Sequence, residues 1–299
     1  MSDPNRKTLD LDAYPIVGVV RNAIVGATGS SLVGLYVYGS IATGAFEPRV
    51  SDIDLIAALR DRPDEALIRR LAAMHADLVR AEPDWNDRIE VDYVSARGLA
   101  HCRTRTTTIA RISPGEPLHE IEAGRDFLLD WYPARQDAIE LHGPRIDSLI
   151  PPIPEAEYLE EVRKYLACFR DRFDDDAAPG SQAYAILTMC RGVAAVRFGD
   201  RLSKREAAVR AQEEFPRWAD LIDRALRWRD RHQGADQPDG AGTLAETRAF
   251  IADMEEQLGG PDGSAAGNDS DRRAPLSCGP ACMGGEDVTR EDRGWALDG

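Results

Sequence analysis

Two short segments place the strongest limits on how this chain folds. Residues 35–38 have the apolar pattern of a buried strand, which runs directly into Gly39 and Ser40. Eleven residues later, Asp52 and Asp54 alternate with apolar residues. Side chains two apart in a strand share one face, so we expect both aspartates to project together while the residues between them enter the core.

This arrangement predicts a site for a metal-bound nucleoside triphosphate. Two carboxylates on one face repel each other and lose hydration, and a bound cation offsets both effects. The Gly-Ser turn offers backbone N–H groups and a hydroxyl that suit phosphate oxygens. We therefore assign Asp52 and Asp54 to Mg²⁺, and Gly39, Ser40 and Ser51 to nucleotide binding. The alternative is that the two aspartates are solvated residues at the start of a strand.

A third carboxylate is expected on the next strand. Residues 88–94 alternate between polar and apolar side chains, as a half-buried strand does. Glu90 and Asp92 then face the same side. We favour Glu90 as a metal ligand or as the general base for an attacking hydroxyl, with Asp92 as the alternative.

Hydrophobic periodicity and the distribution of proline divide the chain into three parts. Before the proline-rich segment 151–154 we predict helices over 12–29, 64–80 and 126–141, and strands over 33–38, 52–59 and 88–94. Residues 96–125 allow no assignment. After it the pattern is purely helical, with an all-round apolar helix over 182–198, one that starts at the capping box of Ser203, and further helices over 216–231 and 241–258. We thus expect domains over 1–150 and 151–258, and a disordered tail over 259–299 that contains Cys278 and Cys282.

Composition limits the class of partner and the compartment. The net charge of −15 argues against a general nucleic-acid binder and suits a cationic small molecule. The chain shows no apolar run of membrane-spanning length and no signal peptide, and its five cysteines follow no metal-site spacing. We expect a cytoplasmic monomer without membrane or nucleic-acid partners.

These motifs together resemble those of the DNA polymerase β-like nucleotidyltransferase superfamily. More narrowly, the chain is similar to the aminoglycoside adenylyltransferases that act on streptomycin and spectinomycin. The similarity covers most of residues 30–230. It rests on LYVYGSIATGAFEPRVSDIDLIAAL (35–59), RIEV (88–91), LHGPRIDSLIPPIPEAEYLEEV (141–162), AILTMCR (185–191), Gly199 and the SKREAA…EEFP segment (203–216).

The resemblance implies an α+β fold, with an N-terminal nucleotidyltransferase mixed sheet followed by a C-terminal helical bundle. ATP and the antibiotic are expected in the cleft between the two. Asp52 and Asp54 match the metal-binding aspartates of that family, Glu90 its proposed catalytic base, and Ser40 its phosphate-binding serine. The implied reaction is Mg²⁺-dependent transfer of AMP from ATP to a hydroxyl of a small molecule.

The departures from the family concern the acceptor. Arg205 and Val209 stand where the streptomycin enzymes carry two aspartates that meet the cationic drug. An arginine there repels a cationic acceptor, so the same chemistry on another small molecule or on a protein hydroxyl stays open. A non-catalytic nucleotide-binding module is a further alternative, and polymerase-type activity on RNA a weaker one. Arg191 and Lys204 are candidates for phosphate binding, with solvated side chains as the alternative for each.

Overall fold

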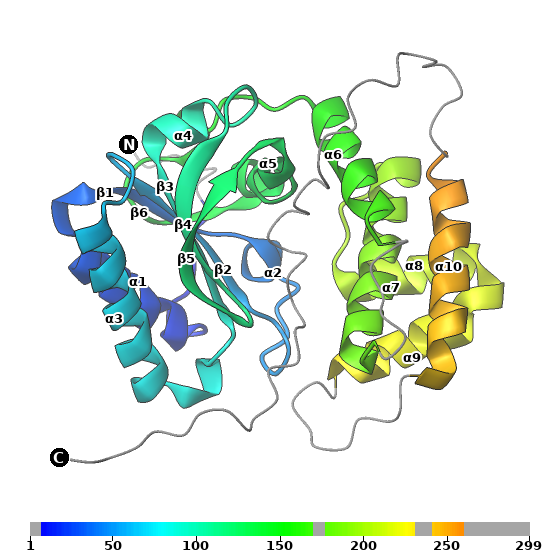
Figure 1. The fold of residues 1–299 in the computed structure, drawn as a ribbon. Coiled ribbons are helices and arrows are strands. Elements are labelled where there is room, and N and C mark those ends of the chain that lie inside the picture. Colours follow the sequence, from blue (N-terminus) through cyan, green and yellow to red (C-terminus); the bar gives the residue numbers. More distant parts are fainter. Residues whose placement is uncertain (1–6, 170–176, 231–240, 260–299) are drawn as a thin grey trace.

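The computed structural model describes residues 7–169, 177–230 and 241–259. The chain forms a sheet with flanking helices, followed by a bundle of helices beside it (Figure 1). This is the α+β architecture that the sequence predicted. The predicted tail, with Cys278 and Cys282, lies outside the described residues except for its first residue.

The sheet is mixed and has six strands. They are β1 (Leu32–Val37), β2 (Ile53–Leu59), β3 (Ile89–Ser95), β4 (Thr107–Ser113), β5 (Glu116–Ala123) and β6 (Ile139–His142). Their order in space is β5-β4-β3-β2-β1-β6. Only β2 and β3 are parallel, and the other neighbours are antiparallel. The parallel pair at the centre carries the acidic residues singled out above.

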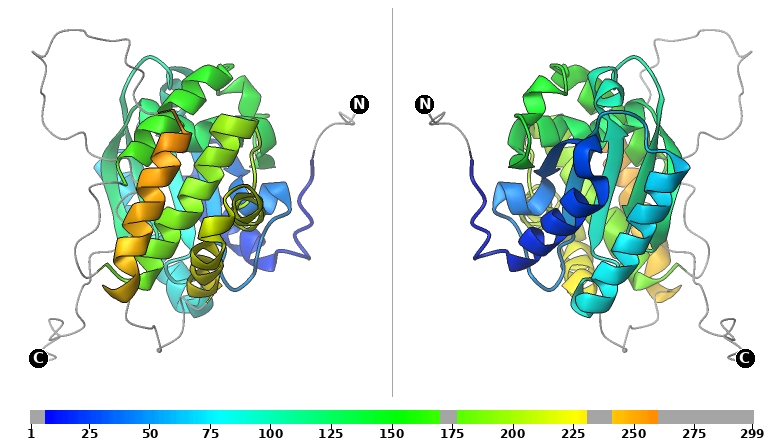
Figure 2. Two further views of the ribbon diagram at one scale, coloured as in Figure 1. Left: turned by 90° about the vertical axis from the view of Figure 1, so that its right-hand side faces the viewer. Right: turned by 90° about the vertical axis from the view of Figure 1, so that its left-hand side faces the viewer.

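Helices cover the two faces of the sheet unequally. Helices α1 (Pro15–Thr28) and α3 (Glu65–Ala81) lie side by side over one face, in the right-hand view of Figure 2, and share a hydrophobic core with it. Their apolar residues recur at helical spacing, and α3 starts where Asp64 accepts a hydrogen bond from the Leu67 N–H at 2.7 Å. The opposite face packs on α4 (Ala96–Ala100) and α5 (Leu128–Asp137). That second face is the one that turns toward the helical bundle (Figure 1).

The bundle is built around one central helix. Its members are α6 (Glu155–Ala167), α7 (Pro179–Val193), α8 (Lys204–Glu214), α9 (Ala219–Asp230) and α10 (Leu244–Gln257). Helix α7 continues as a π-helical turn over Ala194–Phe198, and it contacts all the other four. Its burial on nearly every side explains the all-round apolar sequence. The capping box at Ser203 is present: its hydroxyl accepts from the Glu206 N–H, and the Glu206 carboxylate accepts from the Ser203 N–H.

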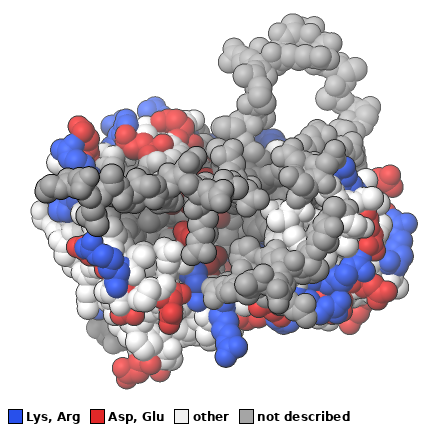
Figure 3. Space-filling model, turned by 60° about the horizontal axis from the view of Figure 1, so that its bottom comes forward, with Lys and Arg blue, Asp and Glu red and all other residues white. Residues whose placement is uncertain are grey.

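Charges of both signs are interspersed on the face shown in Figure 3. Several of the basic side chains of the bundle have acidic partners. On α9, Arg227 pairs with Asp223 one turn away, and Arg229 Nη1 lies 2.8 Å from Glu47 Oε1. The basic sequence around residues 227–229 is therefore neutralised locally rather than forming a basic surface.

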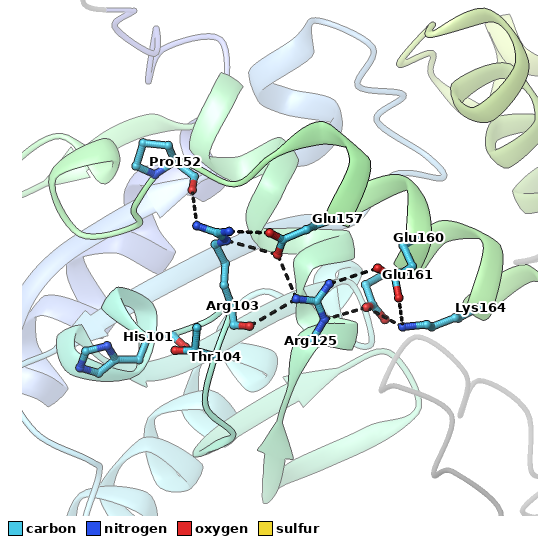
Figure 4. A network of polar contacts seen from close by, with 9 residues as sticks. All are labelled: His101, Arg103, Thr104, Arg125, Pro152, Glu157, Glu160, Glu161 and Lys164. Carbon is cyan, nitrogen blue, oxygen red and sulfur yellow. Dashed lines mark hydrogen bonds and ion pairs between the residues drawn. The ribbon is translucent and has the colours of Figure 1, made fainter. Parts of the chain in front are cut away.

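An arginine–glutamate network ties α6 to the sheet part (Figure 4). Arg103, in the loop after α4, donates from Nε to Glu157 Oε2 at 3.2 Å, and its Nη1 reaches the Pro152 carbonyl. Arg125 donates to the same Glu157 oxygen at 2.9 Å and to Glu161 Oε1 at 3.0 Å. Glu157 thus joins two arginines from different loops. This shared carboxylate fixes the start of the helical part against the sheet.

The structure corrects one predicted element and fills a gap. The helix predicted over 126–141 ends at Asp137, and residues 139–142 form strand β6 beside β1. The turn between them lets Ile139 enter the core of the sheet, an outcome that tertiary packing decides. The unassigned residues 96–125 contain α4 and the β4–β5 hairpin. Strand β5 lies at the edge of the sheet, which explains its polar sequence.

No helix in the described ranges is long and apolar enough to cross a membrane. We propose that the chain divides at residues 151–154, where the last element of the sheet part gives way to α6.

The contact between α6 and α7 yields a stability prediction. A β-carbon at Gly192 would lie 2.1 Å from Leu166 Cδ1. A β-carbon at Gly26, an exposed residue of α1, would meet nothing within 4 Å. We expect Gly192→Ala to lower the free energy of unfolding by about 1–2 kcal/mol, because overpacking outweighs the gain in helix propensity. Gly26→Ala should raise it by about 0.5–1 kcal/mol. Urea denaturation of both variants tests this, and equal effects would contradict the packing argument.

Candidate active site

The Gly-Ser motif and the second aspartate form one packed unit. After β1 the chain enters a short helix, α2 (Gly39–Thr43), instead of a simple turn. Gly39 has φ of +64°, and a β-carbon there would lie 2.1 Å from Asp54 Oδ2. The Tyr38 N–H donates to the Asp54 carbonyl at 3.0 Å. The glycine is therefore required by its backbone conformation and by the carboxylate beside it.

Strand register brings the acidic residues to one face. In the parallel β2–β3 pair, Asp54 lies directly beside Glu90. Asp92 follows two residues later on the same face. Asp52 immediately precedes β2, two residues before Asp54, and its charge raises the pKa of Asp54. All four belong to the face that turns away from α1 and α3.

Burial and mutual repulsion make these carboxylates reluctant to ionise. Burial raises the pKa of Asp54 to about 7, with further contributions from Asp52 and Asp130. Burial also raises the pKa of Glu90 well above its usual range, while the nearby Arg111 guanidinium opposes that shift. Positive charge delivered to this face would relieve the repulsion.

The structure separates the environments of Glu90 and Asp92. The Asp92 side chain is fully buried, and both of its oxygens have partners: Oδ1 accepts from Arg111 Nη1 at 3.0 Å and Oδ2 from Trp131 Nε1 at 3.2 Å. The Glu90 side chain is 17% exposed and accepts from Arg111 Nη2 at 2.5 Å. Of these two residues, Glu90 is the one that a ligand can reach.

The acidic residues fit a hard cation in part. Asp52 and Asp54 supply carboxylate oxygens, the ligands that Mg²⁺ prefers, in a place where a cation relieves repulsion. Among residues 7–169, 177–230 and 241–259, however, no three histidine, cysteine or acidic side chains are arranged as a metal site. Glu90 is paired with Arg111 instead. A magnesium ion here would take two protein carboxylates, with its other ligands coming from phosphate oxygens and water.

Cations from the bundle face this acidic group. Lys204, the first residue of α8, lies 5.3 Å from the centre of the Tyr184 ring. Burial lowers the pKa of Lys204, Arg191 lowers it further, and Asp52 and Asp54 act in the opposite direction. The lysine therefore lies within electrostatic reach of both the acid pair and Arg191. The structure brings these four predicted residues to one region between the sheet and the bundle.

The two serines of the motif are placed differently. Ser40 is half-buried in α2, and Figure 1 shows α2 on the side of the sheet that faces the bundle. Ser51 is buried, and its hydroxyl accepts from the Glu47 N–H at 3.0 Å, while its own N–H donates to the Glu47 carbonyl at 2.8 Å. Ser51 thus closes the loop before β2 and already uses its hydroxyl there.

Several residues of the site escaped the sequence argument. Arg111, Asp130 and Trp131 lie in or next to the stretch 96–125, which had no assignment. Arg111 had a usable signal, since it is the one charged residue of β4 and stands between the apolar residues Ala110 and Ile112. Glu47 carried no signal in the sequence, because its role depends on long-range ion pairs with Arg229 and Arg205. Arg205 also lies 3.2 Å from Asp230. Those partners meet only in the folded chain.

A mixed sheet carries the acidic residues beside a Gly-Ser motif, and Lys204 of the bundle lies within electrostatic reach of them. Residues 148–257 match the family model described as aminoglycoside adenylyltransferase, C-terminal domain. The fold is similar to the crystal structure of spectinomycin adenyltransferase AAD(9) from Enterococcus faecialis with ATP and spectinomycin. The TM-score is 0.64 and the identity 17%, over 82% of this chain and 98% of that chain. No curated protein matches the sequence. The match of residues 148–257 and the shared fold both agree with the resemblance to aminoglycoside adenylyltransferases that the sequence motifs indicate.

The raised pKa of Asp54 predicts a pH-dependent change in stability. The folded state holds this proton up to about pH 7, whereas an unfolded aspartate releases it near pH 4, so the unfolding free energy falls between those values. Asp54→Asn should therefore stabilise the protein at pH 8, by about 1–3 kcal/mol after allowance for solvent screening. The gain should shrink toward pH 5. Denaturation at both pH values measures it, and a variant that is destabilised equally at both would contradict the argument.

The Gly39–Asp54 contact can be separated from backbone strain. Gly39 and Gly44 both have positive φ, but a β-carbon at Gly44 would meet nothing within 4 Å. Gly44→Ala should cost about 1 kcal/mol from strain alone, and Gly39→Ala about 2–4 kcal/mol from strain and overlap. When Asp54 is also replaced by alanine, the overlap is absent. Gly39→Ala should then lower the free energy of unfolding by only about 1 kcal/mol, the cost of backbone strain alone. Chemical denaturation of the four variants tests this, and additive effects would show that the two residues are not in contact.

Proposed function

We propose that the protein transfers AMP from ATP to a hydroxyl of a small molecule, with Mg²⁺, and that the acceptor is of the aminoglycoside type. One observation carries the proposal. The charges of Asp52 and Asp54 on the sheet and of Lys204 on the bundle act on one another, and Arg191 acts on the same lysine. A metal-bound triphosphate needs both: carboxylates for the cation and basic groups for the phosphates.

In this proposal the nucleotide lies between the sheet and the bundle. The triphosphate meets the backbone at Gly39 and Ser40 on one side and the Lys204 ammonium on the other. The solved relative with this fold contains ATP, which supports ATP as the co-substrate. Magnesium, when bound by Asp52 and Asp54, neutralises charge that develops on the phosphates.

Glu90 is proposed to handle the proton of the acceptor. The acceptor oxygen forms a bond to the α-phosphorus while the bond from that phosphorus to the bridging oxygen of the β-phosphate breaks. Pyrophosphate leaves, and the hydroxyl proton passes to the Glu90 carboxylate. Its partial exposure and its position beside Asp54 in the β2–β3 register support this role over Asp92.

Two observations bear on the acceptor. The bundle matches the family model of aminoglycoside adenylyltransferases, and the solved relative contains spectinomycin, which supports an acceptor of this kind. The ion pairs of Arg205 with Glu47 and Asp230 hold an arginine where the family resemblance implies an aspartate, which disfavours an acceptor that brings a cation to this position. The second candidate is therefore the same reaction on another small molecule or a protein hydroxyl. All groups invoked come from one chain, so a monomer suffices, and the use of ATP agrees with a cytoplasmic location.

The test is pyrophosphate release with ATP and Mg²⁺ against a panel of aminoglycosides, including streptomycin and spectinomycin, and other hydroxylated antibiotics. Asp52→Asn and Asp54→Asn should each lower kcat/KM at least about 100-fold, because charge on the triphosphate is then poorly neutralised. Asp77→Asn, on the exposed face of α3, is the matched control and should leave the rate unchanged. Mass spectrometry should find one added AMP on the acceptor.

The same assay distinguishes the remaining alternatives. Glu90→Gln should lose rate by about 100-fold or more with little change in ATP affinity. If Asp92→Asn shows this pattern and Glu90→Gln does not, the base is Asp92. Binding of ATP without turnover of any acceptor would favour a non-catalytic nucleotide-binding module.

A further inference from the structure

Arg111 of β4 lies at the centre of the buried charges beneath the candidate active site. Its side chain is only 1% exposed, and the β3–β4 register places it directly opposite Asp92. Burying a guanidinium costs free energy unless it is paired and hydrogen-bonded. Its partners therefore indicate what the residue does.

The guanidinium bridges two carboxylates instead of clamping one. Nη1 donates to Asp92 Oδ1 at 3.0 Å and Nη2 to Glu90 Oε1 at 2.5 Å, while Asp130 Oδ2 lies 3.6 Å from Nη1. The buried Nε has no hydrogen-bond partner within the described part of the chain. An arginine that binds a single carboxylate usually donates two parallel hydrogen bonds to it. This guanidinium instead joins the fully buried Asp92 to the partly exposed Glu90.

One end of this bridge is fixed and the other faces the site. Asp92 is completely buried and is held from behind by Trp131 Nε1 at 3.2 Å. The Phe127 ring centre lies 5.4 Å from the Arg111 Cζ and packs against the guanidinium. Glu90, at the other end, is the partly exposed member. Arg111 is thus anchored in the core and presents a fixed donor to Glu90.

We propose that Arg111 is a positioning residue, which Asp92 and Trp131 hold in place so that it fixes the Glu90 carboxylate toward the acceptor hydroxyl. This inference rests on the proposed role of Glu90. The competing explanation is that Arg111 serves only to neutralise the buried Asp92. A lysine cannot replace it, because one ammonium on a flexible stem cannot hold both carboxylates in this geometry.

The experiment must remove the bridge without leaving the fully buried Asp92 carboxylate unpaired. Arg111→Gln alone leaves Asp92 uncompensated and is expected to unfold the protein. The double variant Arg111→Gln/Asp92→Asn removes both charges, so it should fold while Glu90 loses its anchored donor. We expect kcat to fall about 100-fold with the KM for ATP changed less than about threefold. The single variant Arg111→Lys should keep only a small part of the wild-type kcat, because a lysine cannot hold both carboxylates in this geometry. A double variant with the wild-type kcat would show that Arg111 only neutralises Asp92 and would overturn the proposal.

Two further measurements separate positioning from other effects. In a Glu90→Gln background the double variant should cause no further loss of kcat, because Arg111 acts through Glu90; a further full loss would contradict the proposal. Crystal structures of the wild type and the double variant give a readout that does not depend on activity. The Glu90 carboxylate should leave its wild-type position, and its retention there would overturn the proposal. If the wild type releases no pyrophosphate with any acceptor, the proposed function fails, and the crystal structures still decide whether Arg111 positions Glu90.

Discussion

The candidate site depends on the close approach of one carboxylate to one glycine. Asp54 Oδ2 occupies the space that a β-carbon at Gly39 would need, 2.1 Å away. Because the glycine begins α2 two residues after the end of β1, this contact fixes where the backbone turns relative to β2. The peptide groups around Gly39 and the acid pair are therefore brought to the same point of the sheet. The Gly-Ser turn and the acid pair can therefore act on the same ligand only because this contact brings them together.

The sheet side of the site carries an excess of buried negative charge, and the bundle side an excess of buried positive charge. On the sheet, burial and Asp52 raise the pKa of Asp54; on the bundle, burial and Arg191 lower the pKa of Lys204. Each side therefore disfavours its own charged state. A divalent cation would relieve the first and a polyanion the second, so the metal-bound triphosphate of the proposed function would stabilise both at once. The docking of the bundle on the sheet, through Glu157 and its two arginines, holds the two charge sets face to face.

The sequence predicted most of what local patterns determine. Period-2 alternation located β2 and β3, and with them the common face of Asp54 and Glu90, and the capping box located the start of α8 with Lys204. It failed where long-range pairing decides. Strand β6 exists because it pairs with β1, and the hairpin β4–β5 because β4 pairs with β3, so neither could be read from local periodicity. Arg111 belongs to that hairpin, and its partners are about twenty residues away in sequence.

The loop before β2 links the acidic side of the site to the wall where an acceptor is expected. Glu47 binds Arg229 of α9 and Arg205 of α8, one residue from Lys204, while the Ser51 hydroxyl holds the same loop closed one residue before Asp52. A movement of α8 away from the sheet would therefore strain or break ion pairs anchored in the loop that leads into the acid pair. These pairs are partly exposed, so each is weak on its own and can yield to a ligand that offers a better partner. An acceptor that carries its own anionic group could replace Glu47 on the arginines, whereas a purely cationic one would have to enter beside them. In the proposed function, the shape and charge of the acceptor would thus be tied to how the sheet and the bundle are held together.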